Sequence, residues 1–580
     1  MDLPAVVRAG PLSAVFDRGE LRWIRLGSRE VLRGIYVALR APGWVTLPKD
    51  LSDLQIEAGA DRFRIRFTAV HRREGTHFEW QGSLDGEPDG TICFAMDGVA
   101  RTSFLRNRIG LCVLHPIEPC AGEPCVVEHV DGRSEPLTFP RLVAPHQPFL
   151  DVRAIRHQVG PGLEAEVLLT GETFETEDQR NWSDASFKTY STPLALPFPA
   201  EVAPGTRIVQ SVTLRLLRRP EPRREGEAAS DGSSSDRAAA EGAVTIVVDP
   251  AAAFPVPRLG LGLRPDAPPL TPLDAERLRA LHLDHLRVDL RLAEPGWREA
   301  LVGAVAAAEA VGASLEAALF LPDAPETALD ALAEAVRGLP AAVSCWLVFR
   351  AADRSTIAPL VTAVRRLLTP ASPAARLAGG TDGHFVELNR RRPSAEGLDR
   401  VSFALSPQAH ATDDATVVEN LASLSSMGES ARALYGEKAL GLSPVTLRPR
   451  DDPDPADARQ SSVLGAAWTA GLIGRAAASG FSSLTLYETV GRRGVMDGNG
   501  VFPVYDVLAE VGGASPGSVV AARSSRPDRV VALALRTAGR MRVLAFNVGR
   551  TRLDVRVVVG KDRARDLLLE PDALVCLDVD

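Results

Sequence analysis

The sequence predicts a multidomain protein of α/β plus β class, in which a (β/α)8 TIM barrel lies between two β-sandwich domains. Residues 244–514 contain eight apolar, strand-like runs that alternate with runs of helical periodicity, and this number of units over this length is typical of a closed barrel. Residues 1–218 and 515–580 show short alternating runs separated by turn residues, which favours sandwiches. A doubly wound open sheet is the alternative for the middle of the chain.

The first domain, residues 1–218, is predicted to form an N-terminal β-sandwich. Asp-Gly pairs, a strong hairpin signal, separate several of its alternating runs. We expect strands at 21–27, 61–70, 77–84, 91–98, 109–115, 163–169 and 207–217. Residues 219–243 are charged, small and nearly free of large apolar side chains, so they are predicted to form a flexible linker.

After the linker the apolar residues take up the pattern of a barrel. Strands enclosed by helices read as nearly continuous apolar runs, and such runs occur at 258–265, 283–292, 314–321, 344–351, 376–390, 399–407, 438–450 and 482–491. Helical periodicity occupies most of the intervals between them. The last domain, residues 515–580, is a small predicted sandwich with strands at 518–525, 529–537, 541–548, 553–560 and 573–580.

Composition and charge limit the classes of binding partner and the cellular compartment that we expect for the protein. The 580-residue chain has a formal net charge of -8, which excludes the basic surface that nucleic-acid binding requires. No apolar run approaches the roughly 20 residues of a membrane helix, and the first residues lack the pattern of a signal peptide. We therefore expect a soluble, cytoplasmic protein that acts on a small molecule and binds neither nucleic acid nor membrane. The sequence leaves the oligomeric state open.

Several common cofactor and nucleophile motifs are missing from the sequence. Neither a GxGxxG motif opening a helix nor a GxxxxGK[ST] loop is present, so we expect no nucleotide cofactor. The six cysteines form no CxxC pair, which argues against a structural zinc site and leaves a catalytic divalent metal as an open alternative. A GxSxG match at 513–517 fails because Pro516 has no N–H to donate to an oxyanion.

Two glutamates are the main catalytic candidates, because catalytic side chains of a barrel lie at the carboxyl ends of its strands. Glu387 is placed at the end of the predicted fifth strand and Glu488 at the end of the eighth. Two carboxyls that face one cleft can divide into an acid and a base. Each glutamate could instead be held in a salt bridge, for example by Arg390 or Arg492. His384, three residues before Glu387, is a third candidate, as a base, a substrate donor or a packed histidine.

Further polar residues are predicted to bind substrate. Some follow predicted barrel strands, namely Asp289, Asn389, Arg448 and Tyr487. Others belong to a dense cluster at 174–199 in the first domain, where aromatic, amide, acidic and basic side chains occur together as in sugar-binding sites. From this cluster and a neighbouring strand we select Asp178, Asn181, Trp182, Lys188 and His115. The cluster could also pack across the mouth of the barrel or be an ordinary polar loop.

Five stretches of the chain resemble the D-apionate lactonase family of bacterial apiose catabolism. They lie at 106–116, 125–132, 139–149, 174–199 and 379–393, and the similarity extends over nearly the whole chain apart from the linker. The resemblance implies hydrolysis of a sugar lactone, D-apionolactone, to D-apionate, and it implies no particular catalytic residues. A water molecule activated by Glu387 or Glu488 would attack the lactone carbonyl.

The predicted barrel also resembles retaining glycoside hydrolases of the large barrel clan. In those enzymes an Asn-Glu pair follows strand four and the nucleophile follows strand seven, whereas the two glutamates here follow strands five and eight and Val386 precedes Glu387. A retaining glycoside hydrolase is therefore the alternative function. A non-catalytic carbohydrate-binding protein is the second alternative.

Overall fold

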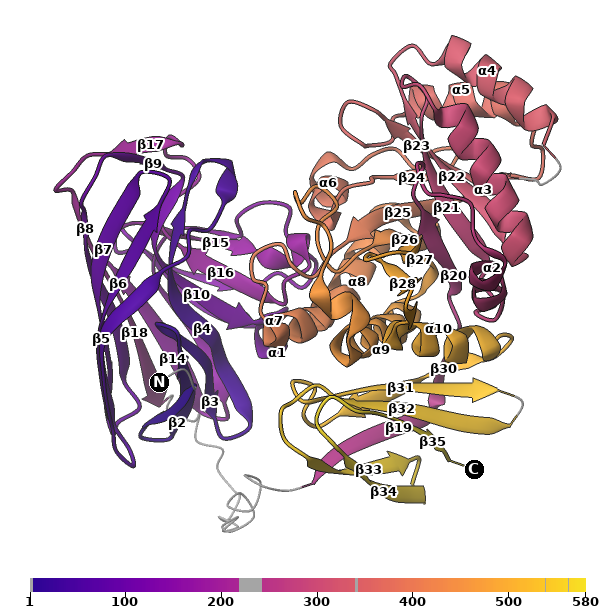
Figure 1. Ribbon diagram of the computed structural model, residues 1–580. Coiled ribbons are helices and arrows are strands. Elements are labelled where there is room, and N and C mark those ends of the chain that lie inside the picture. The colour runs from indigo at the N-terminus through magenta and orange to yellow at the C-terminus, as the bar shows by residue number, and fades with distance from the viewer. Residues whose placement is uncertain (1–3, 219–242, 340–342, 538, 562, 580) are drawn as a thin grey trace. The chain divides into compact units, whose positions relative to one another are not determined.

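The computed structural model describes residues 4–218, 243–339, 343–537, 539–561 and 563–579 (Figure 1). The chain divides into two compact units, one made of residues 1–179 and 185–240 and the other of residues 180–184 and 241–580. Apart from residue 243, the predicted linker lies outside the described residues.

The first unit is built on one long, mainly antiparallel sheet, in the order β1-β2-β3-β4-β10-β16-β15-β13-β14-β18-β8-β7-β6-β5. Its strands are β1 (Ala5–Ala9), β2 (Leu12–Asp17), β3 (Glu20–Leu26), β4 (Arg29–Arg40), β5 (Asp50–Ala58), β6 (Phe63–Arg73), β7 (Thr76–Gly86), β8 (Ile92–Ala100), β10 (Arg108–Pro116), β13 (Phe149–Gly160), β14 (Leu163–Thr170), β15 (Phe174–Asp178), β16 (Ser186–Tyr190) and β18 (Arg207–Arg218). β11 (Pro124–His129) and β12 (Ser134–Thr138) join at β13, and β9 (Phe104–Arg106) pairs with β17 (Ala200–Val202).

This sheet folds back on itself to form a sandwich. Along β7 and β8 every second side chain is buried, as expected for a strand with one face in a core. The two ends of the sheet meet face to face, since the rings of Phe16 on β2 and Phe67 on β6 are 5.8 Å apart. The predicted N-terminal β-sandwich is thereby confirmed.

A pair of neutral histidines is enclosed in this unit. The rings of His115 and His157 are 5.7 Å apart and pack against Phe139. His115 contacts Thr189 at 3.1 Å through Nε2, whereas neither ring nitrogen of His157 has a hydrogen-bond partner within the described residues. Burial lowers the pKa of His115 to about 3 and that of His157 to about 4. Both side chains are therefore core residues held in the neutral form.

These histidines predict a loss of stability in acid. Because their pKa values are lower in the folded than in the unfolded chain, the stabilisation is complete above pH 6.5 and declines as the pH falls towards 3–4. At pH 5 we expect a loss of about 2 kcal/mol per histidine. H157L should flatten the dependence of the melting temperature on pH, and H146Q, which alters an exposed histidine, should not. Equal slopes in H157L and the parent protein would contradict the assignment.

The second unit contains the predicted barrel. Eight parallel strands of the described chain run in sequence order, and β20 also pairs with β27, which closes the barrel. The strands are β20 (Arg258–Leu263), β21 (His285–Arg291), β22 (Ser314–Leu321), β23 (Val343–Arg350), β24 (Arg376–Gly380), β25 (Arg400–Leu405), β26 (Ala439–Val445) and β27 (Phe481–Val490). The helices between and after them are α2 (Pro272–Arg279), α3 (Trp297–Val311), α4 (Glu326–Arg337), α5 (Ala358–Leu368), α6 (Phe385–Arg391), α7 (Asp414–Glu419), α8 (Ser423–Tyr435), α9 (Val463–Ala478) and α10 (Pro503–Gly513).

A buried ion pair crosses the barrel. Glu316 on β22 is fully buried and accepts hydrogen bonds of 3.0 and 2.6 Å from the guanidinium of Arg400 on β25. His285 and Arg258 lie 3.8 Å from the same carboxylate. Burial acts to raise the pKa of Glu316, but the charges of His285 and Arg400 outweigh it and lower the pKa to about 2. The carboxylate is therefore ionised at neutral pH, and its ion pair with Arg400 links β22 to β25.

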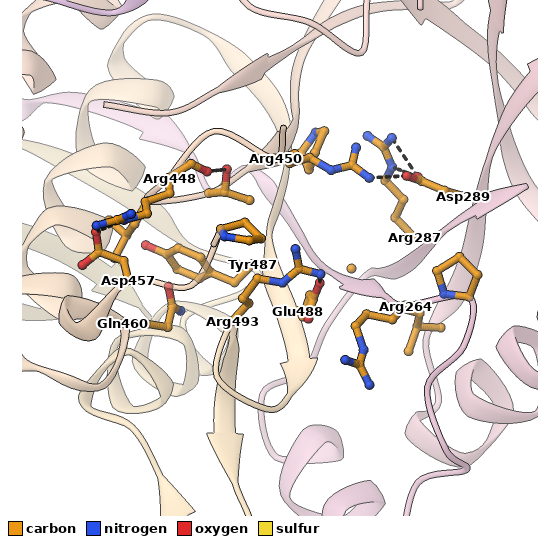
Figure 2. A pocket seen from close by; sticks show the side chains of 17 residues that line it. Arg264, Arg287, Asp289, Arg448, Arg450, Asp457, Gln460, Tyr487, Glu488 and Arg493 are labelled. Carbon is orange, nitrogen blue, oxygen red and sulfur yellow. Dashed lines mark hydrogen bonds and ion pairs between the residues drawn. The ribbon is translucent and has the colours of Figure 1, made fainter. Parts of the chain in front are cut away.

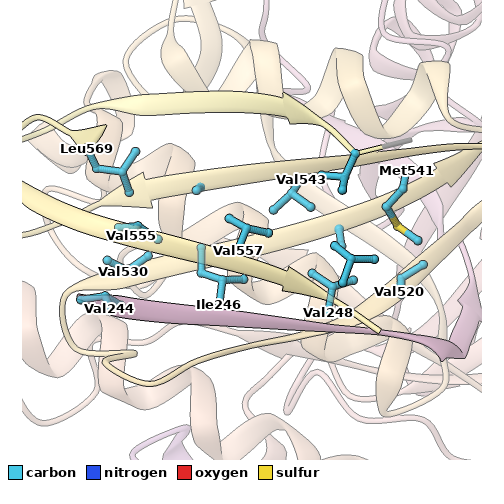
Figure 3. Packing of buried hydrophobic residues seen from close by; sticks show 14 residues of the cluster. Val244, Ile246, Val248, Val520, Val530, Met541, Val543, Val555, Val557 and Leu569 are labelled. Carbon is cyan, nitrogen blue, oxygen red and sulfur yellow. The ribbon is translucent and has the colours of Figure 1, made fainter. Parts of the chain in front are cut away.

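The last sheet corrects one predicted boundary. Its order is β34-β33-β19-β30-β31-β32-β35, and it therefore includes β19 (Val244–Pro255), which the prediction placed in the barrel domain. Val244, Ile246 and Val248 of β19 contribute to the core of this sheet (Figure 3). The barrel strands begin at Arg258, and the other strands of the sheet are β30 (Ser518–Ser524), β31 (Val530–Thr537), β32 (Arg540–Asn547), β33 (Leu553–Val559), β34 (Arg563–Leu569) and β35 (Leu574–Asp578).

The register explains why β19 was misassigned. β19 pairs antiparallel with β30 and parallel with β33. Both of these strands come after the barrel in the sequence. A strand whose partners follow so much later in the chain carries no local sign of where it belongs. Among the described residues, no helix is both long and apolar enough to cross a membrane.

Candidate active site

A polar cavity of about 180 Å³ opens at the carboxyl ends of strands β20, β21, β26 and β27 (Figure 2). This is the end of a barrel at which active sites form. The cavity is lined by Gly262, Leu263, Arg264, Pro265, Arg287, Asp289, Pro444, Thr446, Leu447, Arg448, Arg450, Pro455, Asp457, Gln460, Tyr487, Glu488 and Arg493. Within the described residues, five arginines and three carboxylates therefore face one small space.

Two of the arginines are fixed by a shared pair of carboxylates. Arg287 donates to Asp289 at 3.0 Å and to the buried Asp382 at 2.5 Å. Arg450 donates to both oxygens of Asp382 at 3.1 Å and also contacts Asp289. Burial alone would raise the pKa of Asp289, but the two guanidinium groups hold it well below its usual range. Asp289 is thus a firmly ionised carboxylate and a poor proton acceptor.

Glu488 has a different electrostatic setting. It lies near the end of β27, the eighth strand as expected, and contacts the guanidinium of Arg493. Burial raises its pKa, and the charge of Arg493 opposes that increase only in part. Within the described residues, Glu488 is thus the one carboxylate of the cavity whose pKa is raised, whereas the pKa values of Asp289 and Asp457 are lowered.

Tyr487 presents its ring to the same cavity. Its backbone adopts a positive φ of 48°, which turns the end of β27, and its hydroxyl lies 2.7 Å from the Thr469 hydroxyl on α9. Burial raises the pKa of the phenol, so it remains protonated at neutral pH. In the view of Figure 2 the ring lies between Arg448 and Asp457 on one side and Glu488 on the other.

A larger cavity of about 450 Å³ adjoins the first. Its lining consists mainly of alanines of α3 and of the proline-rich loop before α2, and it shares Arg264 and Glu488 with the polar cavity. Glu488 therefore borders both cavities.

Glu387 is not where the sequence placed it. The fifth strand, β24, ends at Gly380, whose φ of +115° leaves no room for a side chain because a Cβ would lie 2.4 Å from the Ser402 carbonyl oxygen. The chain then turns, and Glu387 lies in the first turn of helix α6. It is absent from the lining of the polar cavity, so the structure does not bring it together with Glu488 there.

Glu387 and His384 are nevertheless unusual. Oε2 of Glu387 and Nδ1 of His384 are buried without a hydrogen-bond partner in the part of the chain that the structure describes. Burial raises the pKa of Glu387 and lowers that of His384, so both neutral forms are favoured. Their predicted catalytic role stays a prediction.

Two residues predicted from the N-terminal cluster belong to the second unit. Residues 180–184 pack with the barrel, where Oδ1 of Asn181 accepts a 3.0 Å hydrogen bond from Asn389. The ring of Trp182 lies 5.1 Å from the guanidinium of Arg390 and 5.4 Å from the ring of His410. Asn181, Trp182 and Asn389 therefore form one cluster beside α6, outside the polar cavity.

The other two residues predicted from that cluster, and His115 from the neighbouring strand, belong to the first unit. Lys188 forms an ion pair with Glu177, and Asp178 accepts a 2.9 Å hydrogen bond from the backbone N–H of Ala144. His115 belongs to the histidine pair of the core. None of the three lines the polar cavity, whereas Asp289, Arg448, Tyr487 and Glu488 do.

Sequence reasoning missed the residues that organise the cavity. Asp382 lies two residues after the end of the fifth strand, and a carboxylate so close to a strand end is the signal that could have identified it. Arg450 stands two residues after Arg448, which was selected in its place. Arg264 and Arg493 lie in loops, where arginine is common and carries no local signal.

Two solved glycoside hydrolases are among the structures to which this chain is distantly similar. A family 30 endoxylanase from Clostridium papyrosolvens has 9% identity over 58% of this chain and 99% of its own, with a TM-score of 0.41. A beta-arabinopyranosidase has 10% identity over 99% of this chain and 98% of its own, with a TM-score of 0.31. At these scores the likeness supports no conclusion about activity.

Comparison with known sequences identifies the family, which the comparison with solved structures does not. The family descriptions "D-apionate lactonase, N-terminal domain" and "D-apionate lactonase, TIM barrel domain" match residues 2–219 and 259–516. A curated D-apionate lactonase from Brucella anthropi is 30% identical over 92% of this chain and 91% of its own length. The chain therefore belongs to the D-apionate lactonase family, and it is a lactone hydrolase.

Proposed function

We propose that the protein hydrolyses D-apionolactone to D-apionate in the polar cavity of the barrel, with Glu488 as the general base. One observation carries the proposal: a carboxylate of raised pKa lines a small, arginine-rich cavity at the carboxyl ends of the barrel strands. Family membership supplies the substrate, since the Brucella anthropi relative is a D-apionate lactonase.

The reaction needs one proton acceptor and a cation. Glu488 removes a proton from water as the water oxygen bonds to the lactone carbonyl carbon, and negative charge develops on the carbonyl oxygen. Arg493 interacts electrostatically with Glu488 and can stabilise that charge. The bond between the carbonyl carbon and the ring oxygen then breaks, Glu488 returns its proton to the leaving oxygen, and the new acid ionises.

This mechanism predicts an acidic limb in the pH profile. Because Glu488 must be ionised, kcat/KM should fall with decreasing pH around a midpoint above the ordinary glutamate value of 4.5. R493M should move that midpoint to higher pH, since the charge of Arg493 lowers the pKa of Glu488. The check is kcat/KM against pH for both proteins, and a midpoint unmoved in R493M would contradict the role of Glu488.

The function itself is tested with purified protein and D-apionolactone. Ring opening should exceed the spontaneous rate in the same buffer, and adding a divalent metal or a chelator resolves whether metal contributes. A set of aryl glycosides tests the glycoside hydrolase alternative in parallel. Lactone loss at only the spontaneous rate, with and without metal, would exclude the proposal.

A further inference from the structure

Arg264 has unused hydrogen-bonding capacity beside the reacting carboxylate. A guanidinium carries five N–H donors, yet within the described residues that of Arg264 makes no hydrogen bond. Its nearest carboxylate is the highly exposed Asp266, at 3.8 Å. By contrast, Arg287 and Arg450 are held by two carboxylates each.

The position of Arg264 gives this capacity a use. It follows β20 at the carboxyl end of the barrel and lines both cavities together with Glu488. Its charge is close enough to lower the pKa of Glu488. Figure 2 shows Arg264, Glu488 and Arg493 on one side of Tyr487, with Arg448 on the other.

Lactone opening changes the charge at this position. A neutral ester becomes a carboxylate, and that anion forms next to the ionised Glu488 that produced it. Like charges in contact repel strongly unless a cation lies between them. Arg493 is already paired with Glu488, whereas the planar fork of Arg264 remains available for a bidentate hydrogen bond to a second carboxylate.

We infer that Arg264 is the core of a carboxylate-binding subsite that retains the ring-opened hydroxy acid, so that the sugar-acid product inhibits the enzyme competitively. Inhibition of turnover by the product rests on the proposed function, because it requires that the protein hydrolyses the lactone. The binding step itself requires only a hydroxy-acid anion. Because the lactone is neutral, Arg264 should matter far more for the affinity of the product than for that of the substrate.

The experiment compares R264Q with R523Q, which alters an exposed arginine on β30 away from the cavity. Calorimetry measures binding of D-apionate and of the corresponding neutral polyol, and initial rates give the inhibition constant of D-apionate and KM for the lactone. In R264Q we expect the dissociation and inhibition constants of D-apionate to rise at least tenfold, with KM changed less than threefold. R523Q should match the parent protein, and the polyol should bind weakly to all three.

The outcomes separate the two proposals. Product binding that is lost in R264Q, in a protein without lactonase activity, would support the subsite and refute the proposed function. Turnover without product binding, or equal binding of D-apionate in the parent protein and R264Q, would refute the subsite and leave the function standing. Equal affinity for D-apionate and the polyol would also refute it.

Discussion

Replacing Glu488 with glutamine is expected to lower kcat for D-apionolactone by about 10²–10⁴-fold, the range that general-base catalysis usually contributes. Glutamine keeps the size and a hydrogen-bonding oxygen but cannot accept a proton from water. Since the side chain is mostly buried beside Arg493, the variant should keep the fold. Rates under substrate saturation, together with melting temperature, provide the measurement.

E387Q is the matched control, because the sequence alone selected both glutamates. Glu387 is absent from the lining of the polar cavity, so its variant should keep kcat within about tenfold of the parent protein, well short of the general-base contribution. If E387Q loses activity and E488Q does not, the reacting carboxylate is at α6 and the assignment to Glu488 is wrong. If both lose activity and remain folded, the two carboxylates act together.

The second large effect concerns stability. R400L should lower the free energy of unfolding by about 3–5 kcal/mol, because it leaves the fully buried Glu316 without its main partner. Arg258 and His285, both 3.8 Å away, offer only partial compensation. Urea unfolding followed by tryptophan fluorescence and circular dichroism would measure the change.

The double variant E316L/R400L separates the charge from the packing. Replacing both partners with apolar residues removes the unpaired charge, so stability should recover most of the loss in R400L. A double variant as unstable as R400L would show that the ion pair contributes through its shape and not through its charge. The single variant R536Q, at a partly buried position of β31, is the control for the effect on stability of removing an arginine in general.

The architecture was largely accessible from the sequence because barrel strands and helices have strong local patterns. Apolar runs such as residues 314–321 and 344–351 coincide with β22 and β23 within one residue. Glu488 was found for the same reason, since it lies near the end of a long apolar strand. Glu387 was misplaced because the extended-looking run 376–390 conceals a break at Gly380, where the backbone approach of Ser402 is set by the neighbouring strand.

The cavity itself depends on contacts between residues far apart in the chain. Asp382 joins Arg287 and Arg450 across the barrel, and no local pattern indicates that three such residues share a network. The same applies to Lys188, which resembles a substrate-binding residue in sequence but is paired with Glu177 on the adjacent strand. Residue type and spacing therefore predicted four of the residues that line the polar cavity, but not the network that organises it.

The place of β19 in the last sheet has a consequence for biosynthesis. Its partners β30 and β33 are translated only after the whole barrel, so this apolar strand leaves the ribosome long before anything can cover it. Pro255 and Ser518 are register partners, which makes the barrel an insertion between two adjacent positions of one sheet. The nascent chain thus carries an open sheet edge throughout barrel synthesis, and any protein that stops short of β30 would expose that edge permanently to aggregation or proteolysis.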